Sequence, residues 1–263
     1  MYQQHFGLKH TPLGSHGKLF DDGPIQALKT RFDWLLENPG IGLLTGEPGV
    51  GKSAVLRELS KTLNPHRYQL IYTPETDFGR LDLYRNLALE LGIEPAYRRA
   101  QLWRDIKTRI SELHDSKSCL PVWIIDEAQN LPNDFFRDFP SFLNFAFDSK
   151  AMMTVWLVGH PRLKRSLQLA NYEALTSRIQ VRASIEPFQE AKRFAQLIEH
   201  ALTTAGCQQT LLSDPGMNML RQASGGRPRH AGRLLVTAMR LATEKGLNHL
   251  PDDLIQHAIE EQQ

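Results

Sequence analysis

Residues 46–53 read GEPGVGKS, and this stretch with its two flanks indicates how the chain folds. The apolar run before it, residues 41–45, is typical of a buried strand, and residues 54–59 after it are typical of a helix. The stretch fits the pattern G-x-x-x-x-G-K-[ST] at every position. Because this pattern lies between a strand and a helix, it predicts a loop whose backbone N–H groups bind phosphate, in preference to a chance glycine-rich turn.

The glycines, the lysine and the serine of this loop have expected roles. Gly46, Gly49 and Gly51 allow the backbone to curl around a β-phosphate, and the N-terminus of the following helix adds partial positive charge. Lys52 is expected to reach the β- and γ-phosphates, and the Ser53 hydroxyl is expected to bind Mg²⁺. The predicted nucleotide-binding residues of this segment are Gly46, Glu47, Pro48, Gly49, Val50, Gly51, Lys52, Ser53 and Ala54.

A second apolar strand carries an acidic pair at its end. Residues 120–125 (LPVWII) are typical of a strand buried on both faces of a parallel sheet, and Asp126 and Glu127 follow. The carboxyl ends of such strands face the ligand crevice of a doubly wound sheet. Asp126 is therefore expected to hold Mg²⁺, directly or through water, and Glu127 to orient and polarise the attacking water. Two merely solvated carboxylates are the alternative, which the upstream phosphate loop disfavours.

The remaining pattern up to residue 185 predicts an α/β core. An amphipathic helix over residues 25–36 precedes the first strand, and strands then alternate with helices. This alternation predicts a five-stranded, parallel, doubly wound sheet. Asn133 is expected to be the N-cap of a helix that extends to about residue 147. The other expected elements are strands over 68–72, 120–126, 153–158 and 180–185 and helices over 81–91 and 99–114.

The pattern changes at Pro187, after which every segment is typical of a helix. The expected helices cover residues 188–205, 214–223, 229–245 and 251–261, and glycines stand at the breaks between them. The sequence therefore predicts a P-loop α/β core followed by a small all-helical lid. The expected domain boundaries are a lead-in over 1–24, a nucleotide-binding core over 25–186 and the lid over 187–263.

Composition and charge narrow the class of protein only slightly. The 263 residues are 41% hydrophobic and have a formal net charge of +2, which argues for neither a nucleic-acid-binding nor an acidic, solvating chain. The two cysteines suit free thiols in a reducing compartment. No apolar run approaches the roughly 18 residues that span a membrane, and the first residues lack the layout of a signal peptide. A cytoplasmic protein without a membrane partner is therefore expected.

The predicted lid contains a candidate anion-binding arginine. In GGRPR, residues 225–229, Pro228 suits the first turn of a helix and places Arg229 near the positive end of that helix. Because arginine opposes the helix dipole at this end, a nearby anion is expected, and a γ-phosphate is the obvious one. An ordinary surface arginine is the alternative.

Five segments occur in the order that AAA+ ATPases have: GEPGVGKS, IIDEAQNL at 124–131, WLVGHPRL at 156–163, LTSRIQVR at 175–182 and GGRPRHAGRLL at 225–235. With the opening YQQHFGLKHTPL, they resemble the ExeA/TniB-like branch of that family over nearly the whole chain. The resemblance implies ATP as the nucleotide, Arg178 as an arginine finger for a neighbouring subunit, and Arg229 as the sensor-2 arginine. It also implies self-association into a ring or a helical filament.

Two features depart from the branch. The sensor-1 position at the end of the fourth strand usually carries a small polar residue, and His160 is the candidate here. Members that act in type II secretion continue into a membrane span and a peptidoglycan-binding region, neither of which this sequence contains. The resemblance therefore favours the separate ATPases of transposons, similar to TniB, MuB, IstB and TnsC, whose implied partners are double-stranded DNA and a transposase.

Residues 97–109 supply the local indication of DNA binding. On a helix, Leu102, Ile106, Ile110 and Leu113 would form a buried stripe. The basic residues outside that stripe could neutralise phosphates without reading bases, although a solvated helix face explains them equally well. The candidate DNA-binding residues are Arg98, Arg99, Arg104 and Lys107.

Three functional hypotheses follow. The first is an Mg²⁺-dependent ATPase that binds DNA largely without sequence preference, assembles on the target and presents it to a transposase. The alternative is an ExeA-like ATPase of secretion or envelope assembly that acts on protein partners. The third is a nucleotide-gated scaffold or remodeller that loads another DNA enzyme.

Overall fold

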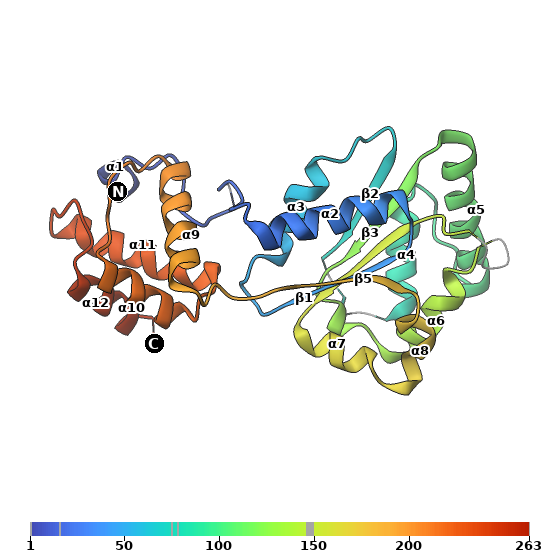
Figure 1. Ribbon diagram of the computed structural model, residues 1–263. Helices are drawn as coiled ribbons and strands as arrows, with labels where there is room; N and C mark the ends of the chain where they lie inside the picture. The colour runs from blue at the N-terminus through green and yellow to red at the C-terminus, as the bar shows by residue number, and fades with distance from the viewer. Residues whose placement is uncertain (1, 16, 75, 78, 146–149, 263) are drawn as a thin grey trace. The chain divides into compact units, whose positions relative to one another are not determined.

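The computed structural model describes residues 2–15, 17–74, 76–77, 79–145 and 150–262 (Figure 1). Their backbone contacts divide the chain into two compact units. We call residues 23–47 and 55–185 the sheet unit, and residues 1–22, 48–54 and 186–263 the helical unit. Each unit is described separately below.

The sheet unit contains a five-stranded parallel sheet, which confirms the predicted fold class. The strands lie in the order β2-β3-β4-β1-β5, so β1 pairs with β4 on one side and with β5 on the other. Since all strands are parallel, their carboxyl ends share one edge of the sheet. The strand bounds are β1 Ile41–Gly46, β2 Tyr68–Thr73, β3 Leu120–Ile125, β4 Thr154–Gly159 and β5 Ile179–Ile185.

Helices cover both faces of this sheet. The central strands β1, β3 and β4 are therefore buried on both faces. On one face α2 (Gly23–Glu37) packs through Phe32, whose ring stacks on Trp156 at 5.6 Å between centroids. On the other face, the inward residues of β1, β3 and β4 join one apolar core with a second set of helices of the unit. These helices are α4 Arg80–Glu90, α5 Arg99–Lys117, α6 Asn133–Phe142, α7 Pro161–Leu167 and α8 Glu173–Thr176.

An aromatic cluster joins three of these helices. Tyr84 of α4 lies against Trp103 of α5 and against Phe135 and Phe142 of α6, at 4.7–5.8 Å between ring centroids. Phe139 stacks on Phe135 at 4.7 Å. Large rings bury much apolar area per residue, so this cluster anchors α4, α5 and α6 beneath the sheet.

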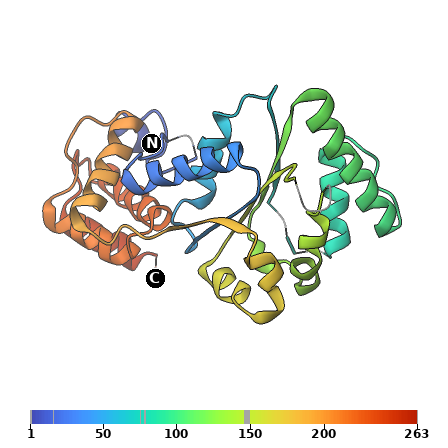
Figure 2. The ribbon, with the colours of Figure 1, turned by 45° about the vertical axis from the view of Figure 1, so that its right-hand side comes forward.

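In the described part of the chain, the helical unit contains four helices after residue 186, the N-terminal segment and residues 48–54. Its helices are α9 Ala191–Ala205, α10 Asp214–Ser224, α11 Pro228–Glu244 and α12 Asp252–Glu260. Both ribbon views place the N-terminal segment, with α1 (Tyr2–His5), beside these helices (Figures 1 and 2). The Lys9 N–H donates to Ala205 O at 2.7 Å, and Phe6 and Leu8 are buried in the core of this unit. Residues 1–22 are therefore part of the packed helical unit.

Two sequence expectations differ from the structure. Asn133 is the first residue of α6 after an N-cap at Pro132, and its Oδ1 accepts a hydrogen bond from the Tyr172 hydroxyl at 2.9 Å. The helix ends at Phe142, before the predicted limit at about residue 147, and residues 146–149 lie outside the described part of the chain.

Within the described residues, none of the helices combines the length and apolarity needed to cross a membrane.

Candidate nucleotide site

The predicted phosphate loop follows directly from β1. The strand ends at Gly46 and α3 (Lys52–Lys61) begins six residues later, so the predicted order of strand, loop and helix is present, with the helix starting two residues before its predicted range of 54–59. Gly49 and Gly51 have φ values of +83° and +107°, a region that favours glycine because a Cβ atom would be strained there. This turn exposes Ser53 and buries Lys52, whose side chain is only 6% accessible.

The start of α11 adjoins this loop within the helical unit. The Arg229 N–H donates to Gly49 O at 3.1 Å, and Arg229 Cβ lies 3.1 Å from where a side chain at Gly49 would begin. The 17-residue helix α11 therefore directs its N-terminal end, with its partial positive charge, to the loop. Arg229, which the sequence identified as an anion-binding candidate, lies next to the predicted phosphate loop.

The acidic pair lies at the carboxyl edge of the sheet, in the sheet unit. Asp126 follows β3 and is 4% accessible. Its Oδ1 accepts the Glu127 N–H at 2.9 Å, and its Oδ2 accepts the Tyr72 hydroxyl at 3.0 Å. Burial, followed by the charge of Asp126, raises the pKa of Tyr72 to about 12, so this hydroxyl remains a donor at physiological pH. The carboxylate of Asp126 is thus held through both of its oxygens.

Glu127 adopts an unusual backbone conformation. Its φ is +51°, in the left-handed region that costs a non-glycine residue about 1–2 kcal/mol. The Thr76 hydroxyl donates to Glu127 O at 2.9 Å and supports this turn. Such conformations persist where the surrounding structure enforces them, and they occur often at functional sites.

Gln129 links Glu127 to the end of β4, and the sequence interpretation did not identify it. Its Nε2 donates to Glu127 Oε2 at 2.5 Å, and its Oε1 accepts the His160 N–H at 2.8 Å. Gln129 lies in the short helix η1 (Ala128–Asn130), directly after the acidic pair. The signal available in the sequence was its place in the DEAQNL segment, two residues after Glu127.

His160, the candidate sensor-1 residue, has a structural role in this arrangement. Its Nδ1 accepts the Arg162 N–H at 3.2 Å, which makes His160 the N-cap of α7. Its link to Glu127 is made by its backbone N–H, which donates to Gln129, and Gln129 in turn donates to Glu127. A sensor role for the imidazole stays a prediction.

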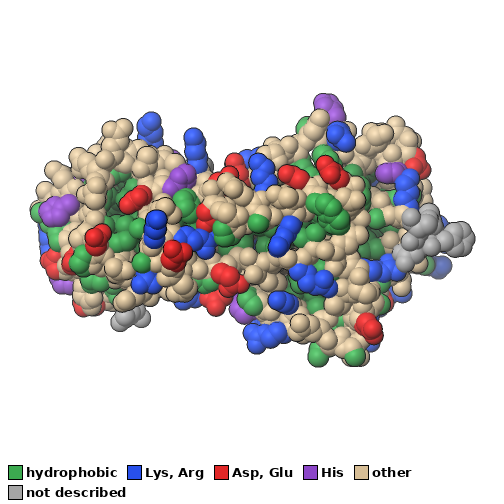
Figure 3. Space-filling model, in the orientation of Figure 1, with side chains coloured by type: hydrophobic (Ala, Val, Ile, Leu, Met, Phe, Trp, Pro, Cys, Tyr) green, Lys and Arg blue, Asp and Glu red, His purple; other side chains and the backbone are tan. Residues whose placement is uncertain are grey.

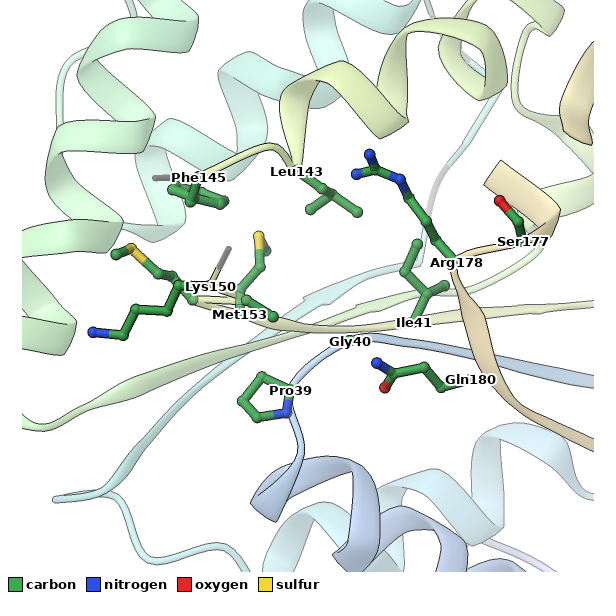
Figure 4. A pocket seen from close by; sticks show the side chains of 12 residues that line it. Pro39, Gly40, Ile41, Leu143, Phe145, Lys150, Met153, Ser177, Arg178 and Gln180 are labelled. Atoms are coloured by element: carbon green, nitrogen blue, oxygen red, sulfur yellow. The ribbon is translucent and has the colours of Figure 1, made fainter. Parts of the chain in front are cut away.

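Arg178 lies at the other edge of the sheet, immediately before β5. Its Nη1 donates to Pro140 O of α6 at 3.1 Å. It lines a cavity of about 270 Å³ at the amino ends of β1, β4 and β5. Figure 4 shows its side chain pointing away from Gln180, toward the side where Leu143 lies. Arg178 and Asp126 are therefore at opposite strand ends of the sheet.

The four candidate DNA-binding residues, one at the N-cap of α5 and three within that helix, differ in their surroundings. The predicted buried stripe is confirmed, since Leu102, Ile106, Ile110 and Leu113 are the buried residues of this helix. Arg99 pairs with Asp138 at 2.7 Å, and Lys107 donates to the carbonyl oxygens of Ser141 and Asn144 at 3.2 and 3.0 Å. Burial lowers the pKa of Lys107. Arg98 and Arg104 have exposed side chains.

Charge is mixed on the face of the molecule that Figure 3 shows. On the described part of the face drawn in Figure 3, basic and acidic side chains are interspersed. This distribution agrees with the net charge of +2. A net charge this small gives no strong overall field, so contact of nucleic acid with this face would depend on local residues.

Comparison with known proteins identifies the class. Residues 35–167, half of the chain, match the profile of the AAA domain family, and the chain belongs to that family. With its fold and family, this protein is an AAA+ ATPase. General secretion pathway protein A of Aeromonas hydrophila is 27% identical over 260 residues, which cover 94% of this chain and 46% of that relative. The chain thus spans less than half the length of that protein.

Solved structures with the same fold come from proteins of low sequence identity. Cdc6p from Pyrobaculum aerophilum has a TM-score of 0.71 at 19% identity, and the match covers 98% of this chain and 70% of that one. Drosophila ORC bound to DNA has a TM-score of 0.71 at 14% identity, covering 99% and 65%. Aeropyrum pernix ORC2, in ADPNP-ADP complexes, has a TM-score of 0.70 at 16% identity, covering 98% and 71%. These matches establish the fold.

Proposed function

We propose that this chain is an Mg²⁺-dependent ATPase that switches between nucleotide states. Residues 46–54 bind the phosphates, with Lys52 as the charged side chain. Ser53 supplies a hydroxyl and Asp126 a carboxylate to Mg²⁺, and oxygen donors of this kind suit that ion. When bound, Mg²⁺ would neutralise charge on the phosphates. Glu127 orients and polarises the attacking water.

The observation that carries this proposal is the placement of two motifs on one sheet. The strand β1 leads into the phosphate loop, and β3 leads into Asp126 and Glu127. In the parallel sheet β1 and β3 are both neighbours of β4, so both strands end at the same edge. Ligands of open α/β sheets bind outside this edge.

Two arginines complete the proposed cycle. Arg229, whose N–H binds the phosphate loop, acts as the sensor-2 residue toward the γ-phosphate. Arg178 acts as an arginine finger in the site of a neighbouring subunit, which suits its distance from the acidic edge of its own sheet. ATP-dependent self-association into a ring or a helical filament follows, because only a neighbour can supply this residue.

We further propose that the assembly binds double-stranded DNA and presents it to a transposase. The exposed side chains of Arg98 and Arg104 support contacts with phosphates. Drosophila ORC and Aeropyrum pernix ORC1, which share the fold, have been solved with DNA. Repeated subunits would multiply weak contacts along one duplex.

A second candidate is an ATPase of a secretion apparatus that acts on protein partners. The similarity to General secretion pathway protein A over 94% of this chain favours it. The two candidates differ in the partner and share the ATPase chemistry.

The deciding experiment measures binding of random-sequence duplex DNA to the purified protein without nucleotide, with ADP and with ATP. Lys52→Ala removes the phosphate-binding lysine, and Lys61→Ala, at an exposed lysine on the same helix, is the matched control. We expect binding only with ATP, its loss in Lys52→Ala and its retention in Lys61→Ala. Binding that ignores nucleotide would refute the switch.

Absence of DNA binding in every nucleotide state would refute the DNA-binding proposal and favour the second candidate, an ATPase that acts on protein partners. Glu127→Gln is then the trap for a partner, because it should bind ATP and nearly stop hydrolysis. If Glu127→Gln hydrolyses ATP at the parent rate, the assignment of the catalytic carboxylate is wrong.

A further inference from the structure

The orientation of the Gln129 amide is determined by its two neighbours. The His160 backbone N–H can only donate, so the atom facing it at 2.8 Å must be the carbonyl oxygen of Gln129. The remaining NH₂ group then faces Glu127 Oε2 at 2.5 Å, and an ionised carboxylate can only accept. A flipped amide would place donor against donor and acceptor against acceptor.

The end of β4 leaves space for the Gln129 amide because its last residue, Gly159, has no side chain. A Cβ atom at Gly159 would overlap Gln129 Oε1, and it would lie 3.2 Å from Leu163 Cδ2. Beside this contact, the Arg162 guanidinium donates to Asn130 Oδ1 at 3.0 Å. The helix η1 is thus joined to the end of β4 and the start of α7 by two adjacent side chains with different partners.

The geometry points to Gln129 as a positioning residue for Glu127. Its amide holds one carboxylate oxygen of Glu127 in a charge-assisted hydrogen bond, and the fixed end of β4 holds the amide in turn. Glu127 is exposed at a turn with φ +51°, so its side chain otherwise has several rotamers to occupy. The inference rests on the proposed role of Glu127 and adds the residue that orients this carboxylate for the water.

The discriminating variant is Gln129→Glu. It keeps the length of the side chain and an oxygen that accepts the His160 N–H, but it replaces the donor that faces Glu127 with a second carboxylate oxygen. The matched control is Asn130→Asp, which makes the same change of charge one residue away, where the side chain faces Arg162. The hydrogen bond from the His160 N–H to residue 129, which joins η1 to the end of β4, is retained in both variants. A loss of activity in Gln129→Glu alone would therefore not come from loss of that bond.

We expect Gln129→Glu to lower kcat for ATP hydrolysis at least tenfold, toward about a hundredfold, because a misplaced catalytic group can cost that much. The Kd for ATP and the behaviour of Asn130→Asp should match those of the parent. Parental kcat in Gln129→Glu would overturn the inference. Unchanged hydrolysis in Glu127→Gln would instead overturn the proposed function, so the two failures are distinguishable.

A stability cycle without nucleotide tests the contact itself. Gln129→Glu alone should lower the melting temperature by like-charge repulsion, whereas the double variant Glu127→Gln/Gln129→Glu exchanges amide and carboxylate and should restore it. Additive effects of the two substitutions would show that the side chains do not interact, and this result would also overturn the inference.

Discussion

Two buried tyrosine hydroxyls differ in their hydrogen bonds. Tyr84 is fully buried in the aromatic cluster, and its hydroxyl has no hydrogen-bond partner among the described residues. Burial raises the pKa of Tyr84 well above its usual value, so the hydroxyl stays neutral. Tyr172 is 7% accessible and donates to Asn133 Oδ1 at 2.9 Å.

Tyr84→Phe should therefore leave the free energy of unfolding unchanged or raise it by about 1 kcal/mol, since it removes a buried group that is desolvated without compensation. Tyr172→Phe, the matched control, should lose about 1 kcal/mol with its hydrogen bond. Urea denaturation of both variants measures the difference. A loss of 1 kcal/mol or more in Tyr84→Phe would contradict this account.

At the scale of elements, α5 uses its basic residues in two ways. Lys107 donates to the carbonyl oxygens of Ser141, in the last turn of α6, and of Asn144, just beyond that helix, and its Nζ lies 5.4 Å from the ring centroid of Phe145. Arg104 extends from the same helix into solvent. Cations near a helix C-terminus are stabilising, so these contacts with the end of α6 account for Lys107 without a DNA-binding role.

Lys107→Ala should consequently lower the free energy of unfolding by about 1 kcal/mol and leave the salt dependence of DNA binding unchanged. Arg104→Glu should leave stability unchanged and weaken DNA binding on all sequences, with a salt slope smaller by about 1. Thermal melts and DNA titrations at several salt concentrations test both. Equal effects of the two variants on the salt slope would refute the distinction.

At the scale of the whole chain, the N-terminal segment packs against helices from the C-terminal third of the chain. The His5 ring contacts Leu247 O at 2.9 Å although 242 residues separate them, and Arg193 pairs with Asp22 at 2.6 Å. Phe6 is 7% accessible in the core of the helical unit. The N-terminal segment therefore contributes apolar surface to that core.

Phe6→Ala should weaken the helical unit by about 3 kcal/mol, because it removes a buried ring. Hydrogen exchange should accelerate in α9 and α11 and remain at the parent rate in β1 and β3, which belong to the sheet unit. Leu89→Ala, at a leucine that is 60% accessible, should leave all of these rates unchanged. Uniform acceleration in both units would show that they unfold together.

Local sequence patterns predicted some residues of the candidate site and missed others. The phosphate loop, Asp126 and Glu127 were predicted because their positions depend on adjacent residues: a strand, a glycine-rich turn and a helix start. Gln129 was missed because its role depends on the His160 N–H, 31 residues away, and on the absence of a side chain at Gly159. The predicted N-cap at Asn133 was wrong by one residue: the N-cap is Pro132, and the Asn133 side chain accepts a hydrogen bond from the distant Tyr172.

The sequence by itself determined the order of elements, the parallel sheet and the motifs at its carboxyl edge, since hydrophobic period and turn chemistry are local properties. Tertiary structure alone decided which basic residues of α5 remain exposed, which group holds Glu127 and where residues 1–22 pack. Each of these depends on contacts between segments far apart in the chain, and no local pattern encodes the partner of such a contact.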